Sequence, residues 1–322
     1  DLLWERSTEL GIAPQGQRSA NDACRLLPTQ DGYVAINLAR AEDWSLLPAW
    51  LEESVEDWSQ LAEHVARRTT MPLLERGRLM GLAVATPDEA ITPSVADELS
   101  DAQIKLSSAP MVVDLSALWA GPLCSHILQQ CGFRVVKVES VQRPDGAREG
   151  SPIHFNALHK GKRLRRFDFA DANDLQGLRE LLASADVVIE GSRPRALRAL
   201  GLDRDSLMGG ACSATSSQLW LSLTAYGRPR PYGDWVGFGD DVAIAAGAYA
   251  LTNNKLPSFL GDAIADPLTG LLGALIVLHL RHWGVCGLVD LSLFRAVNFC
   301  VDWILDSGGV MASPTTYPAL RC

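Results

Sequence analysis

The stretch Met111-Val112-Val113-Asp114-Leu115 opens the part of the chain whose pattern decides the fold. Apart from Asp114 it is a short apolar run, which is typical of a strand buried on both faces of a sheet. Gly121-Pro122 then lead into a helical pattern that continues to Cys131. Strand-like runs and helical patterns alternate from there to residue 305. This alternation predicts an α/β fold with a parallel, Rossmann-like sheet.

The expected domain organisation follows from where this alternation begins. The further strands are expected at residues 134–139, 186–190, 219–223 and 286–291, and the further helices at 174–184, 195–200, 241–251, 267–281 and 292–305. Earlier in the chain, strands are expected at 32–38 and 79–85, with helices at 42–52, 56–68 and 71–78 between them. We therefore expect a linker or loop (1–30), a small α+β domain (31–92), a connector (93–110), a large Rossmann-like domain (111–306) and a tail or linker (307–322).

Composition excludes several classes of protein. The 322 residues are 47% hydrophobic and carry a net charge of −9, so nucleic acid is not expected as a partner. Seven cysteines without a C-x-x-C pair favour reduced thiols, and we expect a cytoplasmic protein. No secretory signal is expected, although the chain does not begin with Met. The apolar residues 263–280 approach the length of a membrane span, but Asp266, Pro267 and His279 favour a buried helix, so no span is expected.

Common cofactor and catalytic motifs are missing from the sequence. The turn after the first large-domain strand has no G-x-G-x-x-G, and no phosphate-binding G-x-x-x-x-G-K-[ST] occurs, which counts against NAD and P-loop chemistry. H-E-x-x-H is also absent, so no metal is expected. The G-x-S-x-G of serine hydrolases does not occur either.

Polar residues instead follow the ends of successive predicted strands. Each of them alone has a structural explanation, as a solvated charge or a helix cap. Together they fall at the carboxyl ends of the strands, where open α/β sheets bind ligands. These residues are Lys137, Glu139, His159 to Arg163, Glu190, Arg193, Tyr226, Asp240, Asp241, Asp262 and Asp266.

Asp266 lies in the stretch Gly261-Asp262-Ala263-Ile264-Ala265-Asp266-Pro267-Leu268-Thr269-Gly270, directly before the longest apolar helix. We expect Asp266 at the N-cap and Pro267 at the first helical position, where its missing N–H costs nothing. The free N–H groups of the helix would stabilise an ionised carboxylate there. Two interpretations follow, a helix cap or a positioned nucleophile. The residues alone favour the cap, because Asp is a common cap residue.

The same segments resemble a known family, the class III CoA-transferases (CaiB/BaiF type), which include the α-methylacyl-CoA racemases. The matching segments occur in the family's order over residues 111–295. They are Val113 to Ser116, Ala120 to Pro122, Val135 to Glu139, His159 to Arg163, Ala185 to Leu202, Leu221 to Gly227 and Gly287 to Leu293. The family's active-site Asp opens a long helix with Gly four residues later, and here this position matches Asp266 and Gly270.

The resemblance implies an acyl-CoA:carboxylate CoA-transferase in which Asp266 is the nucleophile. An acyl-aspartyl anhydride and an enzyme–CoA thioester would be intermediates. The substrates would be an acyl-CoA and a carboxylic acid acceptor, coenzyme A would be the only cofactor, and the protein would be a homodimer. CoA contacts are expected from Trp119, Ala120, Lys137, Glu139, Lys162, Arg163, Glu190, Arg193 and Arg198, and substrate contacts from Tyr226, Asp240, Asp241 and Asp262.

Departures from the family pattern narrow the expected chemistry. The racemases use a His and a Glu as proton carriers, and the matching positions here are Asp240 and Arg295. Arg cannot deprotonate, so transfer is favoured over racemisation. Ser140 and Gly191-Ser192 replace expected CoA contacts. An acyl-CoA racemase, epimerase or lyase stays open as an alternative, and so does a non-catalytic binding module.

The order of the two domains also departs from the family. Residues 31–36 and 81–87 resemble the family's small domain, which normally follows the large domain. The chain is therefore either a circularly permuted member or a piece of a longer, tandem or processed protein. A permutation predicts that Asp1 and Cys322 lie close together.

Overall fold

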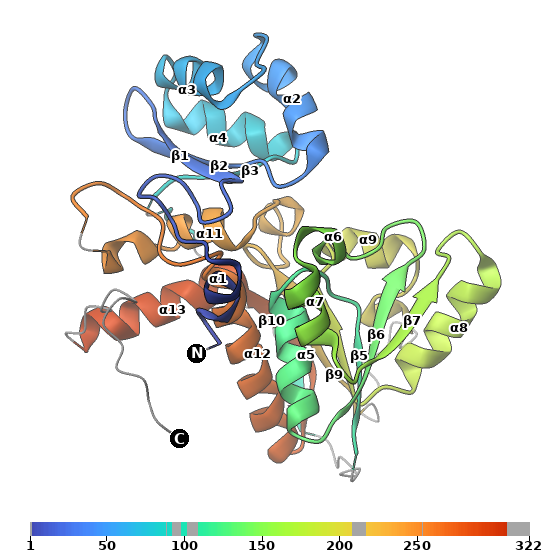
Figure 1. The fold of residues 1–322 in the computed structure, drawn as a ribbon. Helices are drawn as coiled ribbons and strands as arrows, with labels where there is room; N and C mark the ends of the chain where they lie inside the picture. Colours follow the sequence, from blue (N-terminus) through green and yellow to red (C-terminus); the bar gives the residue numbers. More distant parts are fainter. Residues whose placement is uncertain are drawn as a thin grey trace.

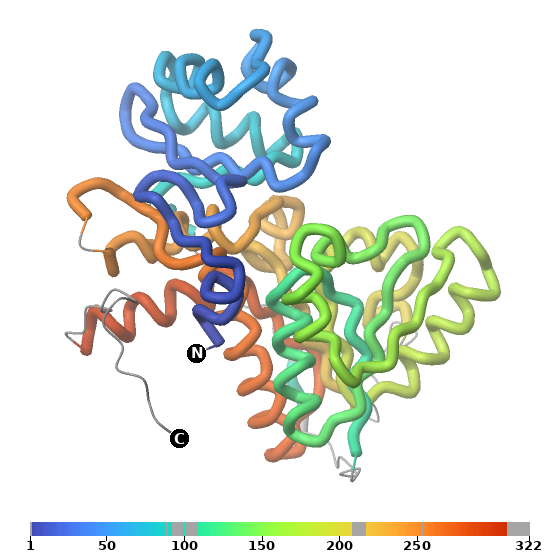
Figure 2. The backbone as a smooth tube through the Cα atoms, viewed as in Figure 1, coloured from blue at the N-terminus to red at the C-terminus, as the bar shows by residue number. Residues whose placement is uncertain are grey.

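A seven-stranded sheet forms the centre of the molecule, and its strand order is β4-β10-β9-β8-β5-β6-β7. The computed structural model describes residues 2–87, 89–91, 98–101, 109–207, 217–252 and 254–307 (Figures 1 and 2). The strands are β4 (Glu98–Asp101), β5 (Met111–Asp114), β6 (Arg134–Ser140), β7 (Arg163–Phe167), β8 (Val187–Glu190), β9 (Leu219–Thr224) and β10 (Val285–Ser292). Every neighbouring pair is parallel except β4 and β10.

The prediction of a Rossmann-like α/β fold is confirmed by this topology. Counted from β5, the six parallel strands have the order 3-2-1-4-5-6. The strand order reverses between β5 and β8, so the loops after these two strands form the crevice where such sheets bind ligands.

Helices cover both faces of the large sheet, which explains the continuous apolar run of β5. Val112 packs in a cluster with α5 (Ala120–Gln130) and α12 (Ala265–His282). The next residue, Val113, points to the opposite face and packs with α8 (Ala172–Ala183) and α9 (Pro194–Ala199). Both side-chain directions of the strand are therefore buried. The short helices α6 (Ala147–Gly150), α7 (Pro152–His159) and α10 (Arg204–Leu207) complete this part.

A small antiparallel sheet precedes the large one in the chain. It consists of β1 (Cys24–Pro28), β2 (Tyr33–Asn37) and β3 (Ala83–Ala85), with α2 (Ala41–Leu51), α3 (Trp58–Ala66) and α4 (Thr70–Leu79) over one face. We call residues 24–85 the small unit. In β2, Val34 and Ile36 face these helices, whereas Ala35 faces the rest of the molecule.

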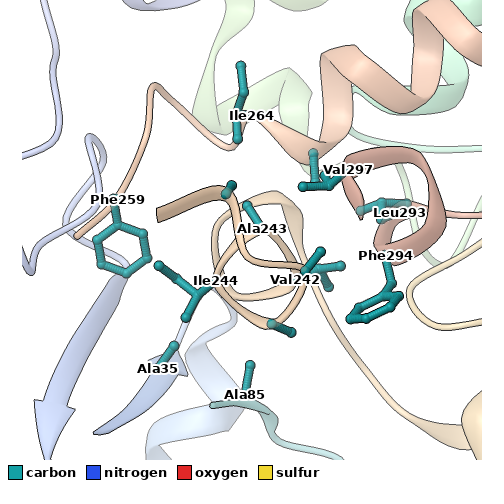
Figure 3. Close-up of a cluster of buried hydrophobic side chains, with 14 of the residues drawn as sticks. Ala35, Ala85, Val242, Ala243, Ile244, Phe259, Ile264, Leu293, Phe294 and Val297 are labelled. Atoms are coloured by element: carbon teal, nitrogen blue, oxygen red, sulfur yellow. The ribbon is translucent and has the colours of Figure 1, made fainter. Parts of the chain in front are cut away.

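A helix of the large part fills the space under the small sheet. Ala35 and Ala85 share one apolar cluster with α11 (Gly239–Ala245), and Figure 3 shows Ile244 of α11 on the side of Ala35. On its other side, α11 packs on α13 (Leu293–Asp306) through Leu293, Phe294 and Val297. The small unit is therefore joined to α11, α12 and α13 of the large part by one apolar cluster.

Several elements differ from the sequence expectation. The expected linker 1–30 contains α1 (Glu5–Leu10) and β1, and the expected connector 93–110 contains β4. Residues 163–167, where no strand was expected, form β7, an edge strand with only Phe167 buried. The helix expected at 241–251 ends at Ala245 and is followed by a 3₁₀ helix, η2 (Ala248–Leu251), because Gly247 adopts a φ of 83°.

Two further expectations concern residues outside the described ranges. The expected tail is described only at Ser307, and both Asp1 and Cys322 lie outside these ranges, so their separation stays a prediction. The domain boundaries stay a prediction as well. None of the described helices is long and apolar enough to cross a lipid bilayer.

Candidate active site

Asp266 lies in the first turn of α12, and the expected capping geometry is wrong. The helix begins at Ala265 with Ile264 at the cap position, so Pro267 is its third residue. The Asp266 carboxylate does not cap its own helix. It accepts hydrogen bonds from the backbone N–H groups of Ala120 and Gly239.

Three helix starts therefore converge on one carboxylate. Ala120 is the first residue of α5, Gly239 is the first residue of α11, and Asp266 itself opens α12. The N–H groups of a first helical turn have no partner within their own helix. Asp266 satisfies two of them and fixes its own side chain in doing so.

Two glycines make this close approach possible. A Cβ atom at Gly239 would lie 2.2 Å from Asp266 Oδ2 and 2.4 Å from the carbonyl oxygen of Ala263. A Cβ atom at Gly270 would lie 2.7 Å from the carbonyl oxygen of Ala120, where α12 packs on α5. The Asp266–Gly270 pattern thus has a physical basis, because Gly270 brings α12 close enough for Asp266 to reach the start of α5.

Three more predicted acids surround Asp266. Asp240 Oδ1 accepts a hydrogen bond from the backbone N–H of Ala263 at 2.9 Å. Asp241 Oδ1 accepts one from Asn37 Nδ2 at 2.9 Å and one from the N–H of Phe238 at 3.0 Å. Asp240, Asp241 and Asp262 are buried, whereas Asp266 is partly exposed. Asp266 is thus the most exposed member of this acidic cluster.

Burial makes these carboxyl groups weak acids. It raises the pKa of Asp266 to about 7, against the influence of the Arg6 cation and the two N–H donors. Burial, together with the Asp262 charge, raises the pKa of Asp240 to about 8. The pKa of Asp241 rises to about 7, and that of Asp262 also rises, again because of burial. The cluster therefore holds protons near neutral pH, as expected for neighbouring carboxylates with little access to water.

The N-terminal segment supplies the cation of this site. Arg6 Nη1 lies 3.3 Å from Asp262 Oδ1 and 3.2 Å from Asp262 Oδ2. The guanidinium also lies over the ring of Trp119, 5.0 Å from its centroid, and His154 meets that ring edge-on at 4.9 Å. Neither Arg6 nor His154 was predicted as a site residue. Arg6 lies 256 residues from Asp262, and no motif contains it.

Four of the predicted CoA contacts lie in buried internal networks. Lys137 Nζ lies 3.3 Å from Asp145 and also donates to the carbonyl oxygen of Ser116. Lys162 Nζ donates to Ser125 Oγ at 2.7 Å and to the carbonyl oxygen of Pro122 at 2.8 Å. Burial lowers the pKa of Lys162 to about 8. Lys137 therefore holds the loop that follows β5, and Lys162 holds the first turns of α5.

The other two of these four residues are the carboxylates Glu139 and Glu190, which also have internal partners. Glu139 accepts hydrogen bonds from Arg148, the shortest at 3.0 Å, and Glu190 accepts one from Arg228 Nη1. Burial raises the pKa of Glu190 despite the adjacent Arg228. Both pairs tie a strand end to a loop.

The remaining predicted residues fall into separate places. Arg193 lines a cleft of about 780 Å³ between the small unit and α9, together with Arg40, Arg78 and Arg195. Arg198 is exposed on α9, and Arg163 is exposed on the edge strand β7. Tyr226 is fully buried beneath the guanidinium of Arg78, 5.6 Å from its ring centroid. The structure thus brings Trp119, Ala120 and the four acids together, and places the arginines of α9 at a neighbouring cleft.

Metal ligands are not clustered in the described part of the chain. No group of three or more His, Cys, Asp or Glu side chains within those ranges is arranged to hold an ion. The acids around Asp266 are each held by N–H donors or by Arg6.

Comparison with known proteins identifies relatives for the large part of the chain. The family model described as CoA-transferase family III matches residues 110–314. An acyl-CoA transferase of Fusarium pseudograminearum is 31% identical over 205 residues, covering 57% of this chain and 44% of that protein. A succinyl-CoA–D-citramalate CoA-transferase of Chloroflexus aurantiacus is 28% identical over 199 residues, covering 58% of this chain and 48% of that protein.

A solved structure shows the same similarity. The crystal structure of a CaiB/BaiF family protein from Brucella suis matches with a TM-score of 0.54 at 27% identity, covering 66% of this chain and 60% of that chain. The chain spans about half the length of the curated relatives it matches.

Proposed function

Because the chain belongs to CoA-transferase family III, we propose that it is an acyl-CoA:carboxylate CoA-transferase with Asp266 as its nucleophile. One observation carries this proposal. Asp266 is a partly exposed carboxylate held by two backbone N–H groups at the meeting point of three helix starts. A carboxylate is a weak nucleophile in water, and fixed position with partial desolvation increases its reactivity.

The reaction then runs through four displacements that need no net proton transfer. An Asp266 oxygen attacks the thioester carbon, the C–S bond breaks, and CoA leaves as a thiolate from a mixed anhydride. The thiolate attacks the Asp266 carboxyl carbon, which releases the donor acid and leaves CoA bound to Asp266 as a thioester. The acceptor carboxylate attacks the Asp266 carboxyl carbon and displaces the thiolate, which gives a mixed anhydride of Asp266 and the acceptor. The thiolate then attacks the acceptor acyl carbon of this anhydride and frees Asp266.

The protein's own groups favour this sequence in two ways. The N–H groups of Ala120 and Gly239 fix the carboxylate before reaction and face the oxygens that gain charge when its carbon is attacked. Near pH 7 the buried acid Asp240 is largely protonated and Asp241 is about half protonated, which reduces the repulsion of incoming anions.

We propose the arginine-lined cleft as the place where the phosphates of CoA bind. Arg193 and Arg195 line it beside Arg40, and no described acid forms an ion pair with Arg193. Arg198 on the same helix adds a further cation. Guanidinium groups bind phosphates through paired hydrogen bonds. Arg193→Gln is expected to raise the KM for acyl-CoA about tenfold, whereas Arg67→Gln, at an exposed arginine that does not line this cleft, should leave it unchanged.

Trapping of the intermediates tests the nucleophile. Succinyl-CoA is a suitable first donor, because several relatives are named for it. Hydroxylamine or borohydride added during turnover should modify Asp266, as detected by peptide mass spectrometry. Asp266→Asn should lose at least about a thousandfold in CoA exchange, as expected for loss of a nucleophile. Asp302→Asn, on exposed α13, is the matched control. Full activity of Asp266→Asn without any adduct would disprove the proposal.

A racemase or epimerase is the second candidate, and one observation favours it. The residue in the family's His position, Asp240, has a pKa of about 8, so it titrates near neutrality together with Asp266. Two such acids can exchange a proton with the α-carbon of an acyl-CoA. Uptake of deuterium at that carbon from D₂O, lost in Asp240→Asn and without exchange of CoA between acids, would establish this activity in place of transfer.

We further propose that the protein acts as a cytoplasmic homodimer. The five described cysteines, Cys24, Cys124, Cys131, Cys286 and Cys300, are all free thiols, which suits a reducing compartment. Phe299 and Trp303 of α13 are 61% and 66% exposed, which suits a surface that pairs with another copy. Sedimentation velocity tests the dimer, and cell fractionation tests the compartment.

A further inference from the structure

The N-terminal helix is packed against the turn that precedes Asp266. Figures 1 and 2 show α1 in front of the start of α12. Leu2 packs against the apolar cluster of Trp119, Leu123, Leu158 and Ala263. The ring of Trp4 fills the space beside Gly261, where an added Cβ would lie 2.6 Å from it. These contacts fix α1 at the candidate active site.

Arg6 projects from this helix into the acidic cluster with unused hydrogen-bonding capacity. Its side chain is only 17% exposed. Within the described part of the chain, only its Nη1 atom has a hydrogen-bond partner, which is Asp262. A guanidinium carries five N–H donors in a planar fork, and two parallel donors match one carboxylate. Arg6 can therefore keep its contact with Asp262 and bind a second carboxylate.

The charges around Asp266 explain why such a contact is needed. Asp240 and Asp241 face it from α11, Asp262 faces it from the preceding turn, and Arg6 is the cation that acts on it. In the proposed reaction, a donor acid leaves and an acceptor acid enters as carboxylates directly beside Asp266. An anion that enters a partly desolvated, acidic site needs a cation to hold it.

We propose that Arg6 is the carboxylate-binding residue of this site and holds the substrate acid next to Asp266. The ligand class is a carboxylate anion, both as the acid released from the donor and as the acceptor. The proposal rests on the proposed transferase function. The proposal adds to that function a substrate contact from α1, whose Arg6 lies 256 residues from Asp262 in the sequence.

A purely structural role of Arg6, as the counterion of buried Asp262, makes a different prediction. Arg6→Gln leaves Asp262 buried without its partner, and this variant alone can lose activity through instability. The double variant Arg6→Gln/Asp262→Asn removes both charges and keeps similar side-chain volumes. If Arg6 were only a counterion, the double variant would recover the wild-type KM for the acid.

Steady-state kinetics separate the two roles. We expect both Arg6→Gln and the double variant to raise the KM for succinate as acceptor at least about tenfold, while the KM for acyl-CoA changes less than about threefold. Arg6→Lys should recover part of the loss, because it keeps the charge but not the fork. Arg18→Gln, which removes an exposed partner of Asp22 in the same segment, is the matched control and should behave as wild type. A KM for succinate within threefold of wild type in the double variant would overturn the proposal.

Direct binding keeps this inference separate from the transferase proposal. Calorimetry with succinate and Asp266→Asn measures acid binding without turnover. We expect heat of binding there and its loss when Arg6→Gln is added. Arg6-dependent binding without any CoA exchange in the wild type would refute the transferase and leave the carboxylate site standing. Exchange of CoA through Asp266 without Arg6-dependent binding of succinate would refute the carboxylate site and leave the transferase proposal standing.

Discussion

At the scale of single residues, the protonation of Asp266 sets the expected rate profile. The attacking group is the ionised carboxylate, and burial raises its pKa to about 7. The rate constant kcat/KM for acyl-CoA should therefore rise between pH 6 and 8 and level off above that range. Stopped-flow measurement of CoA release checks this. A flat profile over the range would contradict Asp266 as the titrating nucleophile.

The same burial gives an expected dependence of stability on pH. The pKa of Asp240 is about 8 in the folded state and that of Asp241 about 7, whereas the ordinary value is 3.8. Between these values the folded state binds more protons than the unfolded state, so stability is present at low pH and is lost as pH rises through 7 and 8. Asp240→Asn, measured by differential scanning fluorimetry, should show a smaller fall in Tm from pH 5 to 8.5 than wild type or Asp302→Asn.

Gly239 is the residue whose replacement should damage the site most directly without changing a charge. The added methyl group of Gly239→Ala meets Asp266 Oδ2 and a backbone oxygen, so the start of α11 has to move. We expect about 1 to 3 kcal/mol of destabilisation and at least a hundredfold lower activity. Gly177→Ala is the control. Its Cβ would lie 3.7 Å from the Phe167 ring, an ordinary contact, and alanine is the better helix former there.

Residue types and spacing were enough to find Asp266, Asp240, Asp241 and Asp262 as site candidates. They were not enough to find what holds Asp266. The backbone N–H groups of Ala120 and Gly239 leave no mark in side-chain chemistry, and Arg6 belongs to a segment without a motif. Lys137 and Lys162 were expected to contact CoA, and the structure places both against internal carbonyl oxygens. A basic residue at a strand end looks the same in the sequence whether it faces a ligand or such an oxygen.

At the scale of elements, the packing of α12 on α5 determines where Asp266 lies. Glycine in a helix interior costs about 0.5 to 1 kcal/mol relative to alanine, and Gly270 allows the backbone of α5 to come near. Gly270→Ala should therefore destabilise the protein despite its better helix propensity, and should also lower activity by separating Asp266 from the N–H of Ala120. Urea unfolding and CoA exchange measure the two effects. Leu275→Ala, 62% exposed on the same helix, should change the unfolding free energy by less than about 0.5 kcal/mol.

Strands buried on both faces were predictable, and the edge strands β1 and β7, which carry arginines, were not. The run 111–115 is apolar apart from Asp114 because helices cover the sheet on both sides. β7 contains Arg163, Arg165 and Arg166 among its five residues, because an edge strand exposes most of its side chains. Its sequence therefore lacks the regular spacing of apolar residues that predicts a strand. Arg25 interrupts the apolar pattern of β1 and Pro28 ends it, so these residues were assigned to the expected linker.

At the scale of the whole molecule, one buried polar contact joins the small unit to the active site. Asn37 of β2 donates to Asp241 of α11, and this hydrogen bond holds the pKa of Asp241 lower than burial alone would. Asn37→Ala should destabilise the protein by about 1 to 3 kcal/mol and raise the pKa of Asp241 further, which steepens the loss of stability with pH. Thermal unfolding at several pH values tests this, with exposed Asn173→Ala as the control.

The pairing of Arg6 with Asp262 has a consequence for the order in which the protein is made. A ribosome adds residues one after another, and the partner of Arg6 is made 256 residues after it. Until then Arg6 lacks Asp262, and Trp4 lacks the Gly261 turn against which it packs. Contacts of such long sequence separation form late and slow folding. Catalytic competence should accordingly be the last property a newly synthesised molecule acquires, after both sheets are already in place.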